Sequence, residues 1–167
     1  VGEDALDVIG IQGGYIEFPE FYDQSNYIEV SPFLAVPLWG NRDQVYYPSL
    51  EMINSEVDRY IEQNVRGCLL NTSAFTETYD IIEKSEIESN TLFRDDATLF
   101  NVEWTVEVRD KMGEVLSEII VHQIESEIQF KSIYIMAESV IKEEYLSFKF
   151  EDLVQDMIAL EHPDVPV

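Results

Sequence analysis

The stretch FNVEWTVEVRD, residues 100 to 110, constrains the fold most, because apolar and polar side chains alternate through it almost without fault. Successive side chains of a β-strand point to opposite faces of its sheet, so one face of this strand is apolar and the other is polar. The apolar phase holds Val102, Trp104, Val106 and Val108. The pattern predicts a half-buried antiparallel strand whose second face meets water.

The neighbouring segments predict the rest of an antiparallel meander. The sequence DKMG after the strand is a turn, and its glycine suits a hairpin bulge. Residues 114–130 then return with Ile120, Ile124 and Ile128 in one phase. Upstream, residues 76–93 predict one or two further strands, joined to the central strand through the polar RDD turn. We therefore expect a sheet with one wet face.

Two regions predict helices that cover this sheet. In residues 50–66 the apolar side chains recur at helical spacing, Ser49 suits the N-cap, and Gly67 suits a left-handed stop. The opposite face of this helix carries charges that we expect to meet water, namely Glu56, Asp58, Arg59 and Glu62. Residues 132–160 hold two further apolar stripes with a break within YLSFKF. The predicted class is α+β, an antiparallel meander with helices packed on one face.

The first part of the chain, residues 1–48, is aromatic and punctuated by proline, which predicts strands and loops. We expect strands at 15–18, 27–30 and 34–39, followed by a hairpin through WGNRDQ. The glycines of GIQGGYIEF give G-x-x-G-G, not the G-x-G-x-x-G of a dinucleotide loop, and a phosphate loop would need a lysine. They predict a bulge or a tight backbone contact. With residues 49–167 this part forms one domain over 1–167.

Composition agrees with one folded domain, since 46% of the 167 residues are hydrophobic. No apolar run approaches the roughly 18 to 20 residues of a membrane helix. Because the chain begins at Val1 without a methionine, we expect that a signal peptide or membrane anchor has been removed.

The chain is strongly acidic, with 34 acidic and 10 basic residues and a formal charge of −24. Such a charge repels a nucleic-acid backbone and an anionic membrane, so we expect no nucleic-acid partner. Three explanations of the acidity stay open: it keeps the protein in solution, it adapts the protein to high salt, or it attracts a cationic ligand.

Little in the sequence suggests catalysis. The imidazoles are His122 and His162, which excludes a multi-histidine metal site, and we expect no metal, no cofactor and no catalytic residue. Cys68 is alone, so it is either a buried inert thiol or a bridge to a cysteine in a missing region or another chain. Asn71 begins a glycosylation sequon, NTS.

Acids and aromatics crowd together between residues 15 and 39. Aromatic side chains mark interfaces, so we predict a protein contact through Tyr15, Phe18, Phe21, Tyr22 and Trp39. The alternative is a carbohydrate-binding or glycoside-hydrolysing domain, which would use Glu17, Glu20 or Asp23.

The segments IGIQGGYI, PSLEMINSEVDRYIEQNVRGCL and SIYIMAESVI resemble a family of uncharacterised surface proteins from small-genome archaea. The residues that carry the resemblance are Gln12, Gly13, Gly14, Tyr15, Pro48, Ser49, Leu50, Tyr60, Ile61 and Cys68. Members of that family typically have an N-terminal membrane anchor ahead of this domain. The resemblance implies an extracellular, membrane-anchored location and no assigned chemistry, and the acidity would suit a member from a salty habitat.

Together these observations predict a non-enzymatic cell-surface domain that contacts a protein partner or a second copy of itself, with the membrane reached only through an anchor outside this chain.

Overall fold

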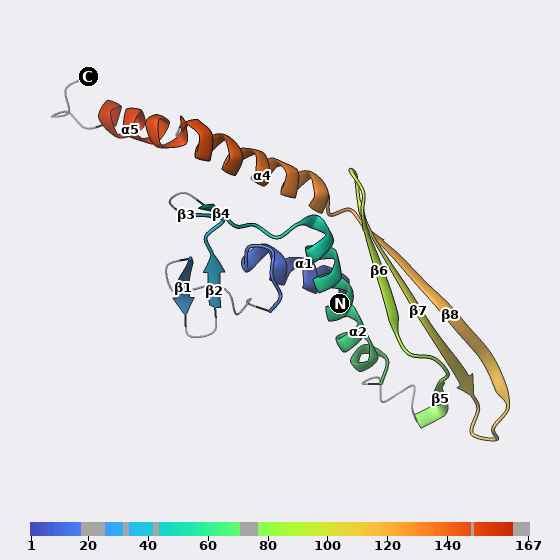
Figure 1. The fold of residues 1–167 in the computed structure, drawn as a ribbon. Helices are drawn as coiled ribbons and strands as arrows, with labels where there is room; N and C mark the ends of the chain where they lie inside the picture. The colour runs from blue at the N-terminus through green and yellow to red at the C-terminus, as the bar shows by residue number, and fades with distance from the viewer. Residues whose placement is uncertain (18–25, 32–33, 42–43, 71–76, 148, 162–167) are drawn as a thin grey trace.

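The protein, seen in a computed structural model, has a twisted antiparallel sheet, two helices packed against it and a helical arm (Figure 1). The structure describes residues 1–17, 26–31, 34–41, 44–70, 77–147 and 149–161. In chain order the elements are α1 (Gly2–Ile11), β1 (Tyr27–Ser31), β2 (Leu34–Pro37), β3 (Gly40–Asn41), β4 (Gln44–Val45), α2 (Leu50–Leu70), β5 (Asp80–Glu83), β6 (Glu88–Phe93), β7 (Thr98–Arg109), β8 (Val115–Ser126), α4 (Phe130–Ser147) and α5 (Lys149–Glu161). The predicted α+β class is confirmed.

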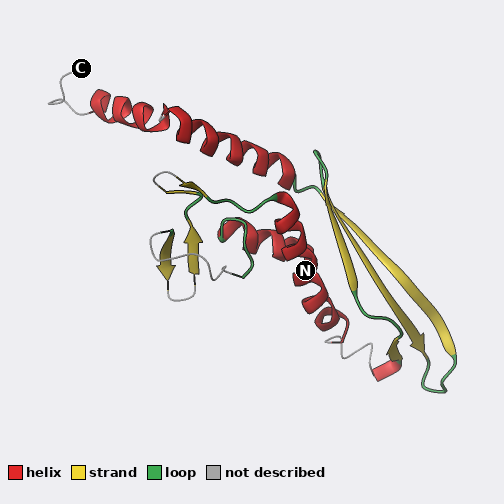
Figure 2. Ribbon diagram, in the orientation of Figure 1, coloured by secondary structure: helices red, strands yellow, loops and turns green. Residues whose placement is uncertain are grey.

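The main sheet is built around β7, the strand that the alternating sequence predicts. One side of β7 pairs with β6 and β5, and the other side pairs with β8 over almost its whole length (Figure 2). All of these pairings are antiparallel, so the predicted meander is confirmed, with β5 and β6 as its two upstream strands. The β7–β8 turn ends on Gly113 at φ +89°, in the left-handed region that the bulged turn requires.

The core lies between β7 and the helices α1 and α2. Ile9, Ile53 and Val57 are at most 1% exposed, and Trp104 on β7 packs against them. Helix α2 was expected in this place. The second covering helix is α1, whereas residues 132–160 contribute to the core mainly through Tyr134 near the start of α4.

Helix α1 corrects the prediction that residues 1–48 contain only strands and loops. Its buried side chains Ala5, Leu6 and Ile9 follow helical spacing, but the helix is short and carries Gly10, so its period is weak in the sequence. The predicted strands at 27–30 and 34–39 correspond to β1 and β2, which pair with each other and not, as predicted for 34–39, with the segment after WGNRDQ. The chain does turn at WGNRDQ, but the paired strands there are the short β3 and β4, at Gly40–Asn41 and Gln44–Val45. Residues 15–17 form no strand, with a bend at residues 16 and 17, and residue 18 lies outside the described ranges.

The glycine pair of the N-terminal segment ends α1. Gly13 adopts φ +62°, and the N–H of Gly14 donates to the carbonyl of Ile9 at 2.8 Å, as in a Schellman motif. A Cβ on Gly14 would lie 2.4 Å from Cγ of Pro48. The prediction of a tight backbone contact is confirmed, and its partner is the residue just before the N-cap of α2.

Helix α2 begins as predicted and ends later. The N–H of Met52 donates to Oγ of Ser49 at 3.2 Å, which confirms the N-cap. The predicted stop at Gly67 is wrong, because the helix continues to Leu70 and Gly67 lies within it. Arg66 in the last turns pairs with Glu83 of β5 at 2.9 Å, so tertiary contacts hold this end in place.

Helices α4 and α5 form an arm that leaves the body of the molecule (Figure 1). The predicted break within YLSFKF falls at residue 148, which lies outside the described residues, between α4 and α5. Across the described ranges, the helices lack the combination of length and apolar character needed to cross a membrane.

Candidate functional site

The predicted aromatic contact set is divided by the structure. Tyr15 is only 3% exposed and belongs to the interior, so its side chain is not available to a partner. Trp39 is half-buried, and its Nε1 donates to the carbonyl of Gly13 at 2.8 Å. Phe18, Phe21 and Tyr22 lie outside the described residues. Tyr15 and Trp39 therefore have structural roles in this fold.

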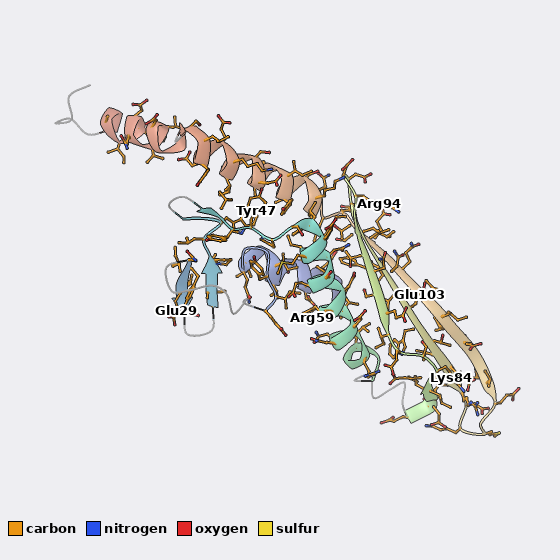
Figure 3. All side chains as sticks on the ribbon, viewed as in Figure 1. Glu29, Tyr47, Arg59, Lys84, Arg94 and Glu103 are labelled. Atoms are coloured by element: carbon orange, nitrogen blue, oxygen red, sulfur yellow. The ribbon has the colours of Figure 1, made fainter. Side chains whose placement is uncertain are left out.

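Trp39, Tyr47 and Tyr134 form an aromatic joint where the arm meets the body of the molecule. Tyr47 is labelled in Figure 3. The three rings lie 5.6 to 6.4 Å apart between centroids. The hydroxyl of Tyr134 donates to the carbonyl of Pro48 at 3.0 Å, and burial raises the pKa of Tyr134. This joint could not be predicted from local sequence patterns, because its members are separated by up to 95 positions.

A polar cluster on α4 strengthens the joint. The hydroxyl of Tyr47 donates to Oε1 of Glu138 at 2.8 Å, and Nζ of Lys142 lies 2.8 Å from the same oxygen. The hydrogen bond from Lys142 lowers the pKa of Glu138, and the carboxylate raises the pKa of Lys142 in return. These contacts fix the direction in which α4 leaves the body.

Among the described residues, the carboxylates predicted for the alternative carbohydrate site do not form a facing pair. Glu17 lies 3.0 Å from the guanidinium of Arg59, which also pairs with Glu56 (Arg59 is labelled in Figure 3). Glu20 and Asp23 lie outside the described residues. A glycosidase needs two carboxyl groups facing each other across a substrate, and Glu17 faces a cation instead.

The structure does not place the other candidate residues in a cluster of reactive side chains. Cys68 is exposed within α2 and lines the cavity described below, so the prediction of a buried thiol is wrong. Asn71 and His162 lie outside the described residues. Among the side chains that the structure describes, no group of three His, Cys, Asp or Glu residues could hold a metal ion.

A cavity of about 530 Å³ opens between α1, the second half of α2 and the inner side of β7 and β8. Its walls are mainly apolar, with Ile61, Phe100 and Ile124 among them. Trp104 and His122 also line it, and Nε1 of Trp104 and Nε2 of His122 are buried without a hydrogen-bond partner in the described structure.

Carboxylates of α2 seal the outer edge of β6. The N–H of Thr91 donates to Oδ1 of Asp58 at 2.7 Å, and the N–H of Ser89 donates to Oε1 of Glu62 at 2.9 Å. Burial raises the pKa of Asp58. The prediction that these two carboxylates face water is wrong. They turn to the sheet because α2 runs along the free edge of β6, whose unpaired N–H groups need acceptors.

Strand β8 forms the other edge and has no such cover in the described structure. Its side chains are exposed at ten of twelve positions, with half-buried His122 and buried Ser126 as the exceptions. Large apolar side chains are exposed by 41 to 67% along it: Val115, Leu116, Ile119, Ile120, Val121 and Ile124. The predicted return strand exists, but it is not half-buried.

The arm is the second large apolar surface. Its exposed apolar side chains include Ile133, Met136, Val140 and Leu146 on α4 and Leu153, Val154, Met157 and Ile158 on α5, and Leu146 reaches 79%. Figure 1 shows none of the described elements beside α5. Monomeric proteins rarely leave contiguous apolar surfaces of this kind open to water.

Comparison of the chain with protein-family models, with curated proteins and with solved structures found no match. The resemblance to the archaeal surface family stays a prediction.

Proposed function

We propose that this protein is a non-enzymatic contact module that binds a partner polypeptide through its arm, α4 and α5. The observation that carries the proposal is the exposed apolar stripe of α5, where Leu153, Met157 and Ile158 are 53 to 59% exposed. A short helix in water is only marginally stable through its intrinsic helix propensity, and packing of its apolar face supplies most of the stability. The exposed stripe of α5 therefore needs a surface to pack against.

The charge of the arm defines the partner further. Acidic side chains flank the stripe, and the described lysines of α4 are already paired, Lys131 with Asp95 and Lys142 with Glu138. An apolar groove bordered by lysine or arginine would complement both features. The partner we propose is therefore a protein with a basic-rimmed apolar groove. Its location outside the cell is a prediction from the sequence.

Photo-crosslinking in cells that make the full-length protein tests this proposal. A benzophenone amino acid at Leu153, on the apolar stripe, should give one discrete crosslinked product. The matched control places the same probe at Asp152, which is also exposed but lies about 100° around the helix, away from the stripe.

The Met157→Glu substitution should then remove the Leu153 product, because it puts a carboxylate into the apolar contact. Equal crosslinking at both positions, or a product that survives Met157→Glu, would contradict a specific contact through the arm.

A further inference from the structure

The cavity between α1, α2 and the main sheet is large enough for a small molecule. Its volume is about 530 Å³, and small-molecule sites usually enclose roughly 300 to 1,000 Å³. Its described walls come from the start of α1, the second half of α2, β7 and β8, and α4 and α5 contribute none of them. A molecule bound in this cavity would therefore leave the arm free.

Two buried nitrogen atoms without partners belong to side chains that line this cavity. Trp104 is 3% exposed, and its Nε1 makes no hydrogen bond within the described structure. Nε2 of His122 is also buried and unpartnered, and the two rings are neighbours, with 6.5 Å between their centroids. A buried polar group without a hydrogen bond lowers stability, and buried tryptophan N–H groups usually have an acceptor. The pair therefore indicates a ligand that brings a polar group to this wall.

The chemistry of the two nitrogen atoms narrows the choice of that group. Nε1 of tryptophan is a donor only, whereas Nε2 of a neutral imidazole donates in one tautomer and accepts in the other. A carbonyl oxygen accepts from both rings in only one of these tautomers. A hydroxyl accepts and donates, so it can bond to Trp104 and to His122 in either tautomer. The group that fits best is therefore a hydroxyl.

The rest of the wall favours an uncharged, apolar body. Ile61, Val65 and Phe100 are among the apolar side chains that line the cavity, and its charged lining side chains, in the described structure, are Glu3 and Asp4. Together with the formal charge of −24, these two carboxylates repel a fatty carboxylate. An alkylammonium ion would be attracted, but it has no lone pair to accept the N–H of Trp104.

We propose that this cavity binds an apolar alcohol. The hydroxyl lies between Trp104 and His122, where its oxygen accepts from Nε1 of Trp104, and the hydrocarbon chain packs against Ile61, Val65 and Phe100. This binding site goes beyond the contact function of the arm, and it gives the uncovered part of the inner sheet face a small-molecule ligand.

Cys68 can report whether the cavity is occupied, because it is exposed, lines the cavity and is the chain's single cysteine. Its reaction with N-ethylmaleimide is followed in the whole chain as hexanol, octanol or decanol is added. A bound alcohol should slow the reaction. The alcohol concentration that halves the rate should fall by about 4-fold for each added methylene until the chain fills the cavity.

Trp104→Phe tests the hydroxyl contact, because it keeps an aromatic ring and removes the N–H. It should raise the half-protection concentration of hexanol by about 2- to 12-fold, the loss of one hydrogen bond. Hexyl chloride has the same chain without a hydroxyl, and its half-protection concentration should change little. Trp39→Phe is the matched control at the chain's other tryptophan, which lies outside the cavity wall, and it should leave both ligands unaffected.

His122→Phe tests the second nitrogen atom at a half-buried position, where a larger side chain is easier to accommodate than in the core. It should also raise the half-protection concentration of hexanol by about 2- to 12-fold and spare hexyl chloride. In the wild type at neutral pH, octanoate should protect Cys68 at least about 10-fold less effectively than octanol, because its charge would be buried beside Glu3 and Asp4.

Any of four results would overturn the assignment of an alcohol site. They are a Cys68 rate that no alcohol slows up to its solubility limit, equal protection by octanoate and octanol, hexanol protection that Trp104→Phe and His122→Phe both leave unchanged, or equal weakening of hexanol and hexyl chloride by both variants. None of these results would affect the crosslinking expected at Leu153, because the arm does not line the cavity.

Discussion

The two edges of the main sheet are built in opposite ways. At the β6 edge Thr91 is fully buried, and its outward N–H is bound by a carboxylate of α2. At the β8 edge Ile124 is 67% exposed. Both edges belong to strands that pair with β7, so the difference does not come from the ladder. It comes from the place of α2, which runs along one edge and not the other.

This difference shows what a small part of the acidity does. Asp58 and Glu62 act as acceptors for a strand edge, a role that a helix backbone cannot provide because its own carbonyls are used. A carboxylate in this position accepts a charge-assisted hydrogen bond, which is stronger than a neutral one. Burial of Asp58 is the cost of that arrangement, and its raised pKa records it.

The largest difference in stability loss is expected between Ile53, which is buried in the core, and Ile120, which lies on the open β8 edge. Ile53→Ala in α2 should lower the free energy of unfolding by about 2–5 kcal/mol, because Ile53 is fully buried and its removal leaves a cavity. Ile120→Ala on β8 should change it by about 0.5 kcal/mol or less, since Ile120 is 55% exposed. Urea unfolding at a concentration where the protein is monomeric measures both.

Similar losses for the two isoleucine variants would mean that β8 is covered in solution, and the contrast between the edges would fail.

The next effect concerns the seal itself. Asp58→Ala should cost about 1–3 kcal/mol, because the buried N–H of Thr91 loses its acceptor. Asp58→Asn is the control, since its amide oxygen can still accept this bond and carries no charge to desolvate. We expect the asparagine variant to be about as stable as the wild type by urea unfolding. A fall of similar size in both variants would show that the charge, and not the acceptor, matters.

A smaller loss is expected at the second acceptor. Glu62→Ala should cost about 1 kcal/mol, because Ser89 is nearer to solvent than Thr91 and water can replace the lost carboxylate. Hydrogen exchange should report it locally, with faster exchange at the Ser89 amide and little change at Val102. Faster exchange across all of β7 would place Glu62 in the global fold instead.

The smallest effect is a dependence on pH. Because the pKa of Asp58 is higher in the folded than in the unfolded state, the folded protein takes up this proton first as pH falls. Wild-type protein should therefore gain stability relative to Asp58→Asn as pH falls from neutral, and the gain should level off below the ordinary aspartate value of 3.8. The opposite slope would show that hydrogen bonds from Thr91 outweigh burial.

Much of the fold could be predicted from local patterns. The alternation around Trp104, the cap at Ser49 and the turn at Gly113 involve residues within a few positions of each other, and all three occur as expected. Helix α1 was missed because ten residues give too few turns to show a period. The end of α2 was misplaced because glycine permits a left-handed stop without requiring one.

The site was less predictable than the fold. The prediction that Tyr15 and Trp39 are surface contacts fails because aromatic residues are common both in cores and at interfaces. The exposed stripe of the arm was visible as helical spacing, but the same spacing is typical of a core helix. The alternating phase of β8 gave no sign that its apolar side would stay uncovered.

The sequence by itself determined which segments become strands, helices and turns, and it set the charge of −24, because these follow from the order of neighbouring side chains. Only the tertiary structure decided which apolar faces are covered. That choice depends on where α1, α2 and the arm lie relative to the sheet, and those positions are set by contacts between distant residues such as Tyr134 and Pro48. For this reason, apolar residues of the same types form the core beneath α2 and an exposed surface on β8.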